Sequence, residues 1–224
     1  LEGRLSYLGY HIDDLVEHCC YEEVVYLLYH RELPTLAQLE SFKKDLASRR
    51  AIPQGVIDYL KAAPKEAGPM DVLRTAVSML GLYDDRAKIG EPDHAANREV
   101  AMSLCAQAGT IVAYFHRARQ GLELPPIRED LSEAGHFIYL YTGEEPGEQA
   151  TRTLDVAYIL HADHGMNAST FSARVTVATL SDFYSAITSA IGTLKGPLHG
   201  GANEGVIKML EEIGSVDKVD AYIE

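Results

Sequence analysis

The longest helical pattern of the chain lies at residues 93–119, which read DHAANREVAMSLCAQAGTIVAYFHRAR. Apolar side chains recur there at steps of three or four residues, the spacing that places them along one face of an α-helix. Gly121 follows as a helix stop. The pattern predicts one long helix whose apolar face consists of Val100, Ala101, Leu104, Cys105, Ala108, Ile111, Val112 and Phe115.

The same period recurs along most of the remaining chain. A capping box of Thr35 and Gln38 and a cap at Ser181 predict helix starts, and Gly143 predicts a helix end. Residues 5–10 carry the one extended pattern that we find, and no repeat or low-complexity linker divides the sequence. We therefore predict a mainly α fold in which residues 1–224 form one large helical domain. The predicted helices lie near 12–30, 36–46, 54–62, 70–80, 93–119, 130–142, 150–164, 181–194 and 202–212.

The chain is acidic. Its 224 residues include 20 Lys and Arg against 33 Asp and Glu, a formal net charge of −13. This balance argues against binding to nucleic acid, which needs a basic face, but it allows a locally positive site for a small anion. No apolar run approaches the ~20 residues of a membrane span, so we expect no membrane association.

Cysteine usage indicates the compartment. Cys19, Cys20 and Cys105 form no CxxC pair, and we interpret all three as free thiols of a reducing, cytoplasmic environment. The first residues, LEGRL, show neither an initiator Met nor a basic n-region. We therefore expect a trimmed start rather than a signal peptide.

A glycine-rich turn near the end of the chain carries a single histidine, in the block LKGPLHGGANE at residues 194–204. Pro197 suits the first turn of a helix, which would place His199 among unpaired N–H groups that disfavour a charged imidazolium. A neutral imidazole can donate a hydrogen bond to a carbonyl oxygen that turns into an enol or enolate. Glycines such as Gly200 allow a substrate to approach the backbone. The alternative is a structural histidine in a turn.

A second dense stretch, HADHGMNAST, occupies residues 161–170. If it ends a helix, His161 and His164 lie one turn apart on one face. Three interpretations remain: a metal site, for which two histidines are too few ligands; a core or capping role for both rings; or recognition of a carboxylate and a carbonyl by His164 with the amide of Asn167. Asp163 would orient a ring or cap the next helix.

The predicted helix 181–194 is unusually rich in small residues, namely Ser185, Ala186, Ser189, Ala190 and Gly192. Small side chains let neighbouring backbones approach closely. The helix is therefore expected either at the interface with a second subunit or at the centre of one subunit's core.

Both histidine blocks resemble the citrate synthase family, whose signature is similar to residues 196–204 and whose upstream histidine motif is similar to residues 161–170. The distance between the blocks is similar as well. Segments 5–15, 22–35 and 69–74 also resemble that family, so the resemblance extends over essentially the whole chain. It implies the large helical domain of the citrate synthase fold and a homodimer through helices that include 181–194.

The resemblance also implies an acyltransferase that condenses acetyl-CoA with oxaloacetate and water to citrate and CoA, in the tricarboxylic acid cycle. It implies that His199 is catalytic and stabilises the enol(ate) of acetyl-CoA while a carboxylate removes a methyl proton. It implies no cofactor, since acetyl-CoA is a substrate, and no metal. The resemblance implies that His164 and Asn167 bind oxaloacetate and that Leu198 and Gly200 contact the acyl-CoA. His161 and Asp163 would support these residues without contacting the substrates.

The family's catalytic aspartate, its third histidine and its substrate-binding arginines come later than Glu224. We therefore expect a chain truncated before the small domain and the C-terminal part, inactive alone, with apolar surface exposed around residues 196–224. One alternative is 2-methylcitrate synthase, which uses propionyl-CoA and tends to carry a tyrosine, a glutamate and a lysine where His161, Asp163 and Leu198 stand here. The other is a non-catalytic helical scaffold.

Overall fold

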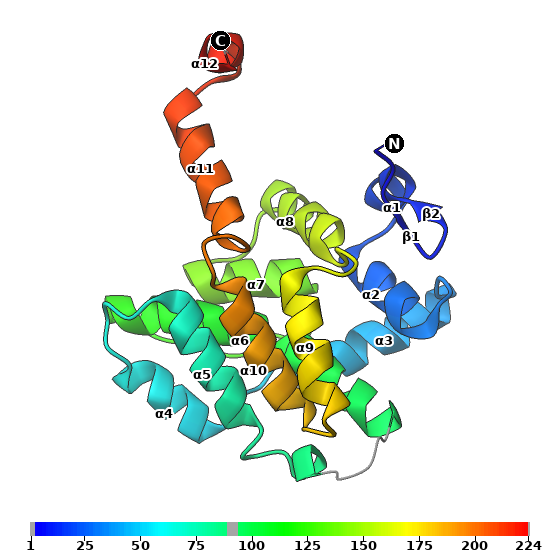
Figure 1. The fold of residues 1–224 in the computed structure, drawn as a ribbon, viewed down its shortest axis with the longest axis vertical. Coiled ribbons are helices and arrows are strands. Elements are labelled where there is room, and N and C mark those ends of the chain that lie inside the picture. The colour runs from blue at the N-terminus through cyan, green and yellow to red at the C-terminus, as the bar shows by residue number, and fades with distance from the viewer. Residues whose placement is uncertain (1–2, 89–93, 224) are drawn as a thin grey trace.

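The computed structural model describes residues 3–88 and 94–223, which form a helical molecule with one small hairpin (Figure 1). This architecture confirms the mainly α prediction. The hairpin pairs β1 (Ser6–Tyr7) with β2 (Tyr10–His11) in antiparallel register. The pattern at 5–10 predicted extended backbone here but not the turn at Leu8 and Gly9, which both have positive φ. The α-helices are α1 (Ile12–His18), α2 (Tyr21–His30), α3 (Leu36–Ser48), α4 (Gln54–Ala62), α5 (Pro69–Leu80), α6 (His94–Gln120), α7 (Glu133–Thr142), α8 (Glu148–His161), α9 (Ala168–Ala178), α10 (Phe183–Leu194), α11 (Gly201–Ile213) and α12 (Val219–Ile223), with 3-10 turns at Asp85–Lys88 and Val216–Lys218.

The helices of the structure differ from the predicted ones in three places. The helix expected near 12–30 is two helices, because the side chain of Glu23 accepts a 2.8 Å hydrogen bond from the Cys20 N–H and starts α2 there. The predicted helices also omit α12 and α9, and the sequence indicates α9 only as the helix that Asp163 would cap. The apolar residues Phe171 and Val175 of α9 are exposed, so no apolar face is directed at the core to reveal the helical period.

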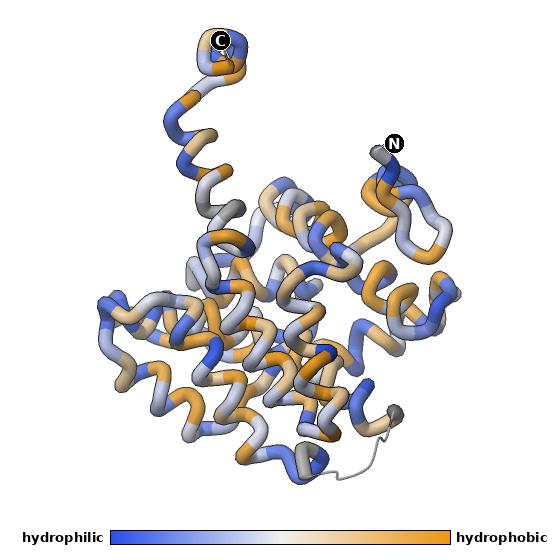
Figure 2. The backbone as a smooth tube through the Cα atoms, viewed as in Figure 1, coloured by the Kyte–Doolittle hydropathy of each residue, from blue (hydrophilic) through white to orange (hydrophobic). Residues whose placement is uncertain are grey.

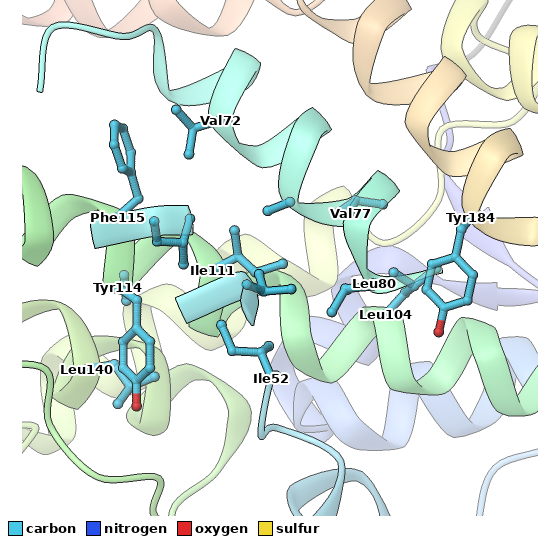
Figure 3. Packing of buried hydrophobic residues seen from close by; sticks show 14 of the residues in the cluster. Ile52, Val72, Val77, Leu80, Leu104, Ile111, Tyr114, Phe115, Leu140 and Tyr184 are labelled. Carbon is cyan, nitrogen blue, oxygen red and sulfur yellow. The ribbon is translucent and has the colours of Figure 1, made fainter. Parts of the chain in front are cut away.

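The long helix α6 is the centre of the main apolar core. Figure 3 shows Leu104 and Ile111 among side chains of α5, such as Val77, and α7, such as Leu140. Helices pack on more than one side of α6, so Ala113 is buried as well, whereas Val112 of the predicted apolar face is 37% exposed. Each fully buried aliphatic side chain contributes about 1.5–3 kcal/mol to the stability of the fold. Together these side chains stabilise the helices that position the histidine segments. Asp93, the first residue of the predicted helix, lies outside the described residues.

Helices α9 and α10 carry the two histidine segments at their ends. They lie side by side, joined by residues 179–182, and α10 also packs on α5 (Figure 1). Tyr184 and Ala186 of α10 are buried, and Tyr184 belongs to the main core. Because α9 and α10 are antiparallel, the start of α9 lies at the same end of the pair as the turn that follows α10.

Helices α11 and α12 project from the helical body (Figure 1). Apolar residues on them remain exposed, including Val206, Ile207 and Leu210, while Ile213 is buried. Figure 2 shows hydrophobic positions along this projecting part of the chain. The expectation of exposed apolar surface around residues 196–224 is thus confirmed. Across residues 3–88 and 94–223, none of the helices combines the length and apolar character needed to cross a membrane.

Candidate active site

Asn167 forms the start of α9. Its Oδ1 accepts a 2.8 Å hydrogen bond from the backbone N–H of Thr170, which caps the helix. The sequence allowed Asp163 to have this role, and that part of the prediction is wrong. Asp163 lies farther back in the loop, where its Oδ1 accepts a 2.9 Å hydrogen bond from the N–H of Gly165.

The glycine-rich block forms a turn between α10 and α11. The His199 N–H donates to the carbonyl oxygen of Gly196, and the Gly200 N–H donates to that of Leu194, both over 2.9 Å. Helix α11 begins only at Gly201, so Pro197 and His199 precede it. The prediction that His199 lies in the first turn of α11 is therefore wrong. Residues 196–200 form a separate turn, which is hydrogen-bonded to the end of α10 before α11 begins.

Gly200 is required in this turn for steric reasons. A Cβ at this position would lie 2.2 Å from the carbonyl oxygen of Leu194, far inside van der Waals contact. Its φ of −68° is one that any residue adopts, so the constraint is space rather than backbone conformation. We predicted that the missing side chain of this glycine leaves space for substrate. The structure shows that it leaves space for the backbone carbonyl group of Leu194.

The ring of His199 points to the start of α9 instead of α11. Its Nε2 lies 3.3 Å from the backbone nitrogen of Ser169 and 2.9 Å from the hydroxyl oxygen of the same residue. A backbone N–H can only donate, so Nε2 accepts and carries no proton in this arrangement. The neutral ring then carries its proton on Nδ1. A helix N-terminus, which disfavours a positive charge, therefore does face His199, but it is the N-terminus of α9.

Ser169 is the site residue that the sequence did not reveal. Its hydroxyl lies 2.8 Å from Oδ1 of Asn167 and 2.9 Å from Nε2 of His199, and so connects the two. A hydroxyl has one hydrogen to donate, so these two contacts compete for it. The available signal was weak: a polar residue two positions after a capping asparagine is commonplace.

Among the described residues, the side chains of His161, Asp163, His164 and Leu198 form no hydrogen bond with this group. His164 is exposed on the loop between α8 and α9, and among the described residues we find no hydrogen bond to its ring. His161 is the last residue of α8, and its Nδ1 lies 2.7 Å from the Ala157 carbonyl oxygen. The two rings therefore do not share one helix face as predicted, because α8 ends before His164. The Leu198 side chain is fully exposed.

Metal ligands were one interpretation of the histidine pair. Within the part of the chain that the structure describes, no three His, Cys, Asp or Glu side chains are grouped as a metal site. Independently of this, the geometry of His199 offers the acid–base and hydrogen-bonding chemistry of an imidazole at a helix N-terminus.

Comparison with known proteins identifies the family of the chain. The family model for the citrate synthase C-terminal domain matches residues 1–224. Citrate synthase 2 of Bacillus subtilis is 51% identical over 224 residues, covering 100% of this chain and 60% of that protein. A 2-methylcitrate synthase of Corynebacterium glutamicum is 44% identical over 226 residues, covering 99% of this chain and 58% of its own.

Solved structures give the same result. The crystal structure of citrate synthase from Pyrobaculum aerophilum has a TM-score of 0.89 and 39% identity, covering 96% of this chain and 55% of that one. A ternary complex of Thermoplasma acidophilum citrate synthase with carboxymethyl coenzyme A and oxaloacetate has a TM-score of 0.87 and 30% identity, covering 99% and 57%. The chain belongs to the citrate synthase family. It spans about 60% of the length of the curated relatives that it matches.

Proposed function

We propose that this chain supplies the enolising histidine and the oxaloacetate-binding loop of a citrate synthase, which condenses acetyl-CoA with oxaloacetate and water to citrate and CoA. The observation that carries the proposal is the geometry of His199, whose Nε2 accepts from the start of α9 while Nδ1 keeps a proton to donate. The reaction needs no cofactor, because acetyl-CoA is itself a substrate.

His199 acts on the thioester of acetyl-CoA. Its Nδ1–H donates to the thioester oxygen while a carboxylate removes a methyl proton, which gives the enol(ate). The enol carbon then attacks the keto carbon of oxaloacetate, whose carbonyl oxygen takes up a proton. Water finally hydrolyses the thioester bond, so that citrate and CoA are released. A neutral imidazole suits the first step because it stabilises the developing charge without needing an additional proton.

His164 and Asn167 bind oxaloacetate in this proposal. His164 is exposed, and its ring is available for a carboxylate or carbonyl oxygen, since no described side chain occupies it. Oδ1 of Asn167 is used by the helix cap, so its Nδ2 side is the one left to donate. The backbone of Leu198 and Gly200 faces the acyl-CoA. The Thermoplasma acidophilum relative was solved with a CoA analogue and oxaloacetate, which supports this substrate pair.

The test is an oxaloacetate titration by calorimetry, on a protein that includes the rest of the relatives' length. His164→Ala should weaken oxaloacetate binding at least tenfold, and His161→Ala, on the adjacent helix end, should change it less than twofold. Unchanged affinity in His164→Ala would remove that residue from its proposed role. For His199, the His199→Gln variant should retain oxaloacetate affinity and lose most of kcat.

A second candidate, 2-methylcitrate synthase, is favoured by one observation: the Corynebacterium glutamicum relative of that name is 44% identical over 226 residues. The two enzymes differ in whether acetyl-CoA or propionyl-CoA is condensed. Against the second candidate stand His161, Asp163 and Leu198, where that subfamily tends to carry other residues. Comparing kcat/KM for the two thioesters decides between them, and a higher value for acetyl-CoA is expected.

A homodimer through α9 and α10 completes the proposal. Helix α9 packs against α10, and its outer face exposes Phe171 (62%) and Val175 (52%). Apolar faces of this kind are typical of subunit interfaces. Phe171→Glu should shift the protein to monomer in analytical ultracentrifugation, while Leu36→Glu, at an exposed leucine of α3, should not.

The three cysteines are free thiols, which fits the cytoplasm as the site of action.

A further inference from the structure

We infer that Tyr7, more than 150 residues away in sequence, is a positioning residue for His164, and that its hydroxyl holds the loop on which that histidine approaches oxaloacetate. This inference rests on the oxaloacetate-binding role proposed above. The distant β-hairpin would then have a function in substrate affinity as well as in packing.

The ring of Tyr7 is anchored firmly. Tyr7 ends β1 and is only 2% exposed, in an apolar cluster that includes Leu15 of α1, Val24 of α2 and Ile159 of α8. An aromatic ring buried on all sides has little rotational freedom. Its hydroxyl is therefore a fixed point in space, set by three helices and the hairpin.

That hydroxyl bonds the end of α8. It donates to the carbonyl oxygen of Ile159 over 2.9 Å, and the Leu160 carbonyl oxygen lies 3.3 Å away. The Ile159 carbonyl oxygen also accepts a 3.3 Å hydrogen bond from the N–H of Ala162, the residue that caps α8. The Tyr7 hydroxyl is therefore a second donor to this buried carbonyl group in the last turn of α8, and it connects the hairpin to the point where this helix ends.

The same hydroxyl also reaches the loop. Its oxygen lies 3.4 Å from the backbone nitrogen of Asp163, whose N–H donates to it. Oδ1 of Asp163 in turn accepts from the N–H of Gly165 over 2.9 Å, and Gly165 adopts a φ of +61° that favours glycine. His164 lies between these two anchored residues.

His164 depends on this backbone for its position. Its own ring is exposed and has no hydrogen bond to a described residue, so packing does not hold it. When the Tyr7 hydroxyl is removed, the loop samples more conformations and the fraction with His164 in the binding position falls. Oxaloacetate must then select that fraction, which weakens its apparent affinity.

The hairpin offers a matched pair of variants. Tyr7→Phe removes only the buried hydroxyl, and Tyr10→Phe removes the hydroxyl of the exposed tyrosine that pairs with Tyr7 in the same hairpin. In a protein that includes the rest of the relatives' length, Tyr7→Phe should raise the KM and the Kd for oxaloacetate about 3- to 10-fold, the effect of one neutral hydrogen bond. It should change kcat and the KM for acetyl-CoA less than twofold. Tyr10→Phe should change none of these constants.

The outcomes separate positioning from plain stability. If Tyr7→Phe lowers kcat through a smaller active fraction and leaves the oxaloacetate KM unchanged, the hydroxyl only stabilises the fold and the inference is overturned. Should Tyr7→Phe not fold, Asp163→Ala removes the other anchor of the loop and must raise the same KM. Unchanged KM in that variant also overturns the inference.

One further comparison keeps the two proposals distinct. If His164→Ala does not weaken oxaloacetate binding, the binding role proposed for His164 fails. If His164→Ala weakens binding and Tyr7→Phe does not, that role stands and only the inference about Tyr7 fails.

Discussion

Ser169 directs both its backbone N–H and its hydroxyl at one ring nitrogen of His199, with the nitrogen 3.3 Å and the oxygen 2.9 Å from Nε2. The first turn of α9 therefore determines the tautomer of a residue that lies 30 positions later. This contact exists because α9 and α10 are antiparallel, so that the start of one helix lies beside the turn that follows the other.

Removing the Ser169 hydroxyl tests this contact, and the kinetic measurements here and below use a protein that includes the rest of the relatives' length. Ser169→Ala keeps the backbone N–H and loses the hydroxyl, and kcat should fall about tenfold because one hydrogen bond to the ring is lost. Ser172→Ala serves as the control, since its hydroxyl pairs with Ser189 one turn farther along α9. The control should retain kcat within twofold. Equal losses in both variants would show a general effect of α9 rather than a specific effect on His199.

The steric requirement at Gly200 gives a second prediction. Gly200→Ala places a Cβ against the Leu194 carbonyl oxygen, so the turn must shift and move His199. A misplacement of about 1 Å costs on the order of 100-fold in rate, which steady-state kinetics would detect. Gly205→Ala, in α11, has nothing within 4 Å of the added Cβ. It should leave kcat unchanged and stabilise the helix by about 0.5–1 kcal/mol.

The hairpin turn is strained at one position. Leu8 and Gly9 both have positive φ, 49° and 94°, as in a type I′ turn, which favours Asn-Gly. A non-glycine side chain in this conformation costs roughly 1–2 kcal/mol, and asparagine tolerates it better than leucine. Leu8→Asn should therefore raise the free energy of unfolding by about 1 kcal/mol in urea titrations. Leu8→Ala, which keeps the Cβ, should give no gain.

A buried histidine makes stability depend on pH. His136 of α7 is 3% exposed, and its Nε2 has no hydrogen-bond partner among the described residues. Burial, with Arg50 and Arg128 nearby, lowers its pKa from 6.5 to about 3. The unfolded chain binds the proton below pH 6.5 and the folded chain does not. Stability is therefore lost as pH falls from 6.5 toward 3.

His136→Leu should remove that loss, about 2 kcal/mol between pH 6.5 and 5, as measured by urea unfolding at the two pH values. Glu133 has the opposite effect on the pH dependence of stability. Burial raises its pKa to about 6 despite Arg50, so its contribution to stability declines as pH rises from about 4.5 to 6. The comparison must therefore be between wild type and His136→Leu. An identical pH dependence in both proteins would contradict the assignment to His136.

Local sequence features determined much of this protein. The helical period predicted α6 and α10, the capping box at Thr35 was observed with its Gln38 partner, and the two histidine blocks indicated the citrate synthase family. These signals are short-range, since helix periodicity, caps and motifs each depend on residues within a few turns of one another.

Only the tertiary structure decided which groups surround the histidines. It directed His199 to the start of α9 instead of α11, brought in Ser169, and joined Tyr7 to the loop of His164 across 156 positions. Contacts of this kind depend on how helices pack against each other, and no periodicity encodes a partner so far away in the chain. The polar groups that orient the two histidines are therefore a property of the folded arrangement.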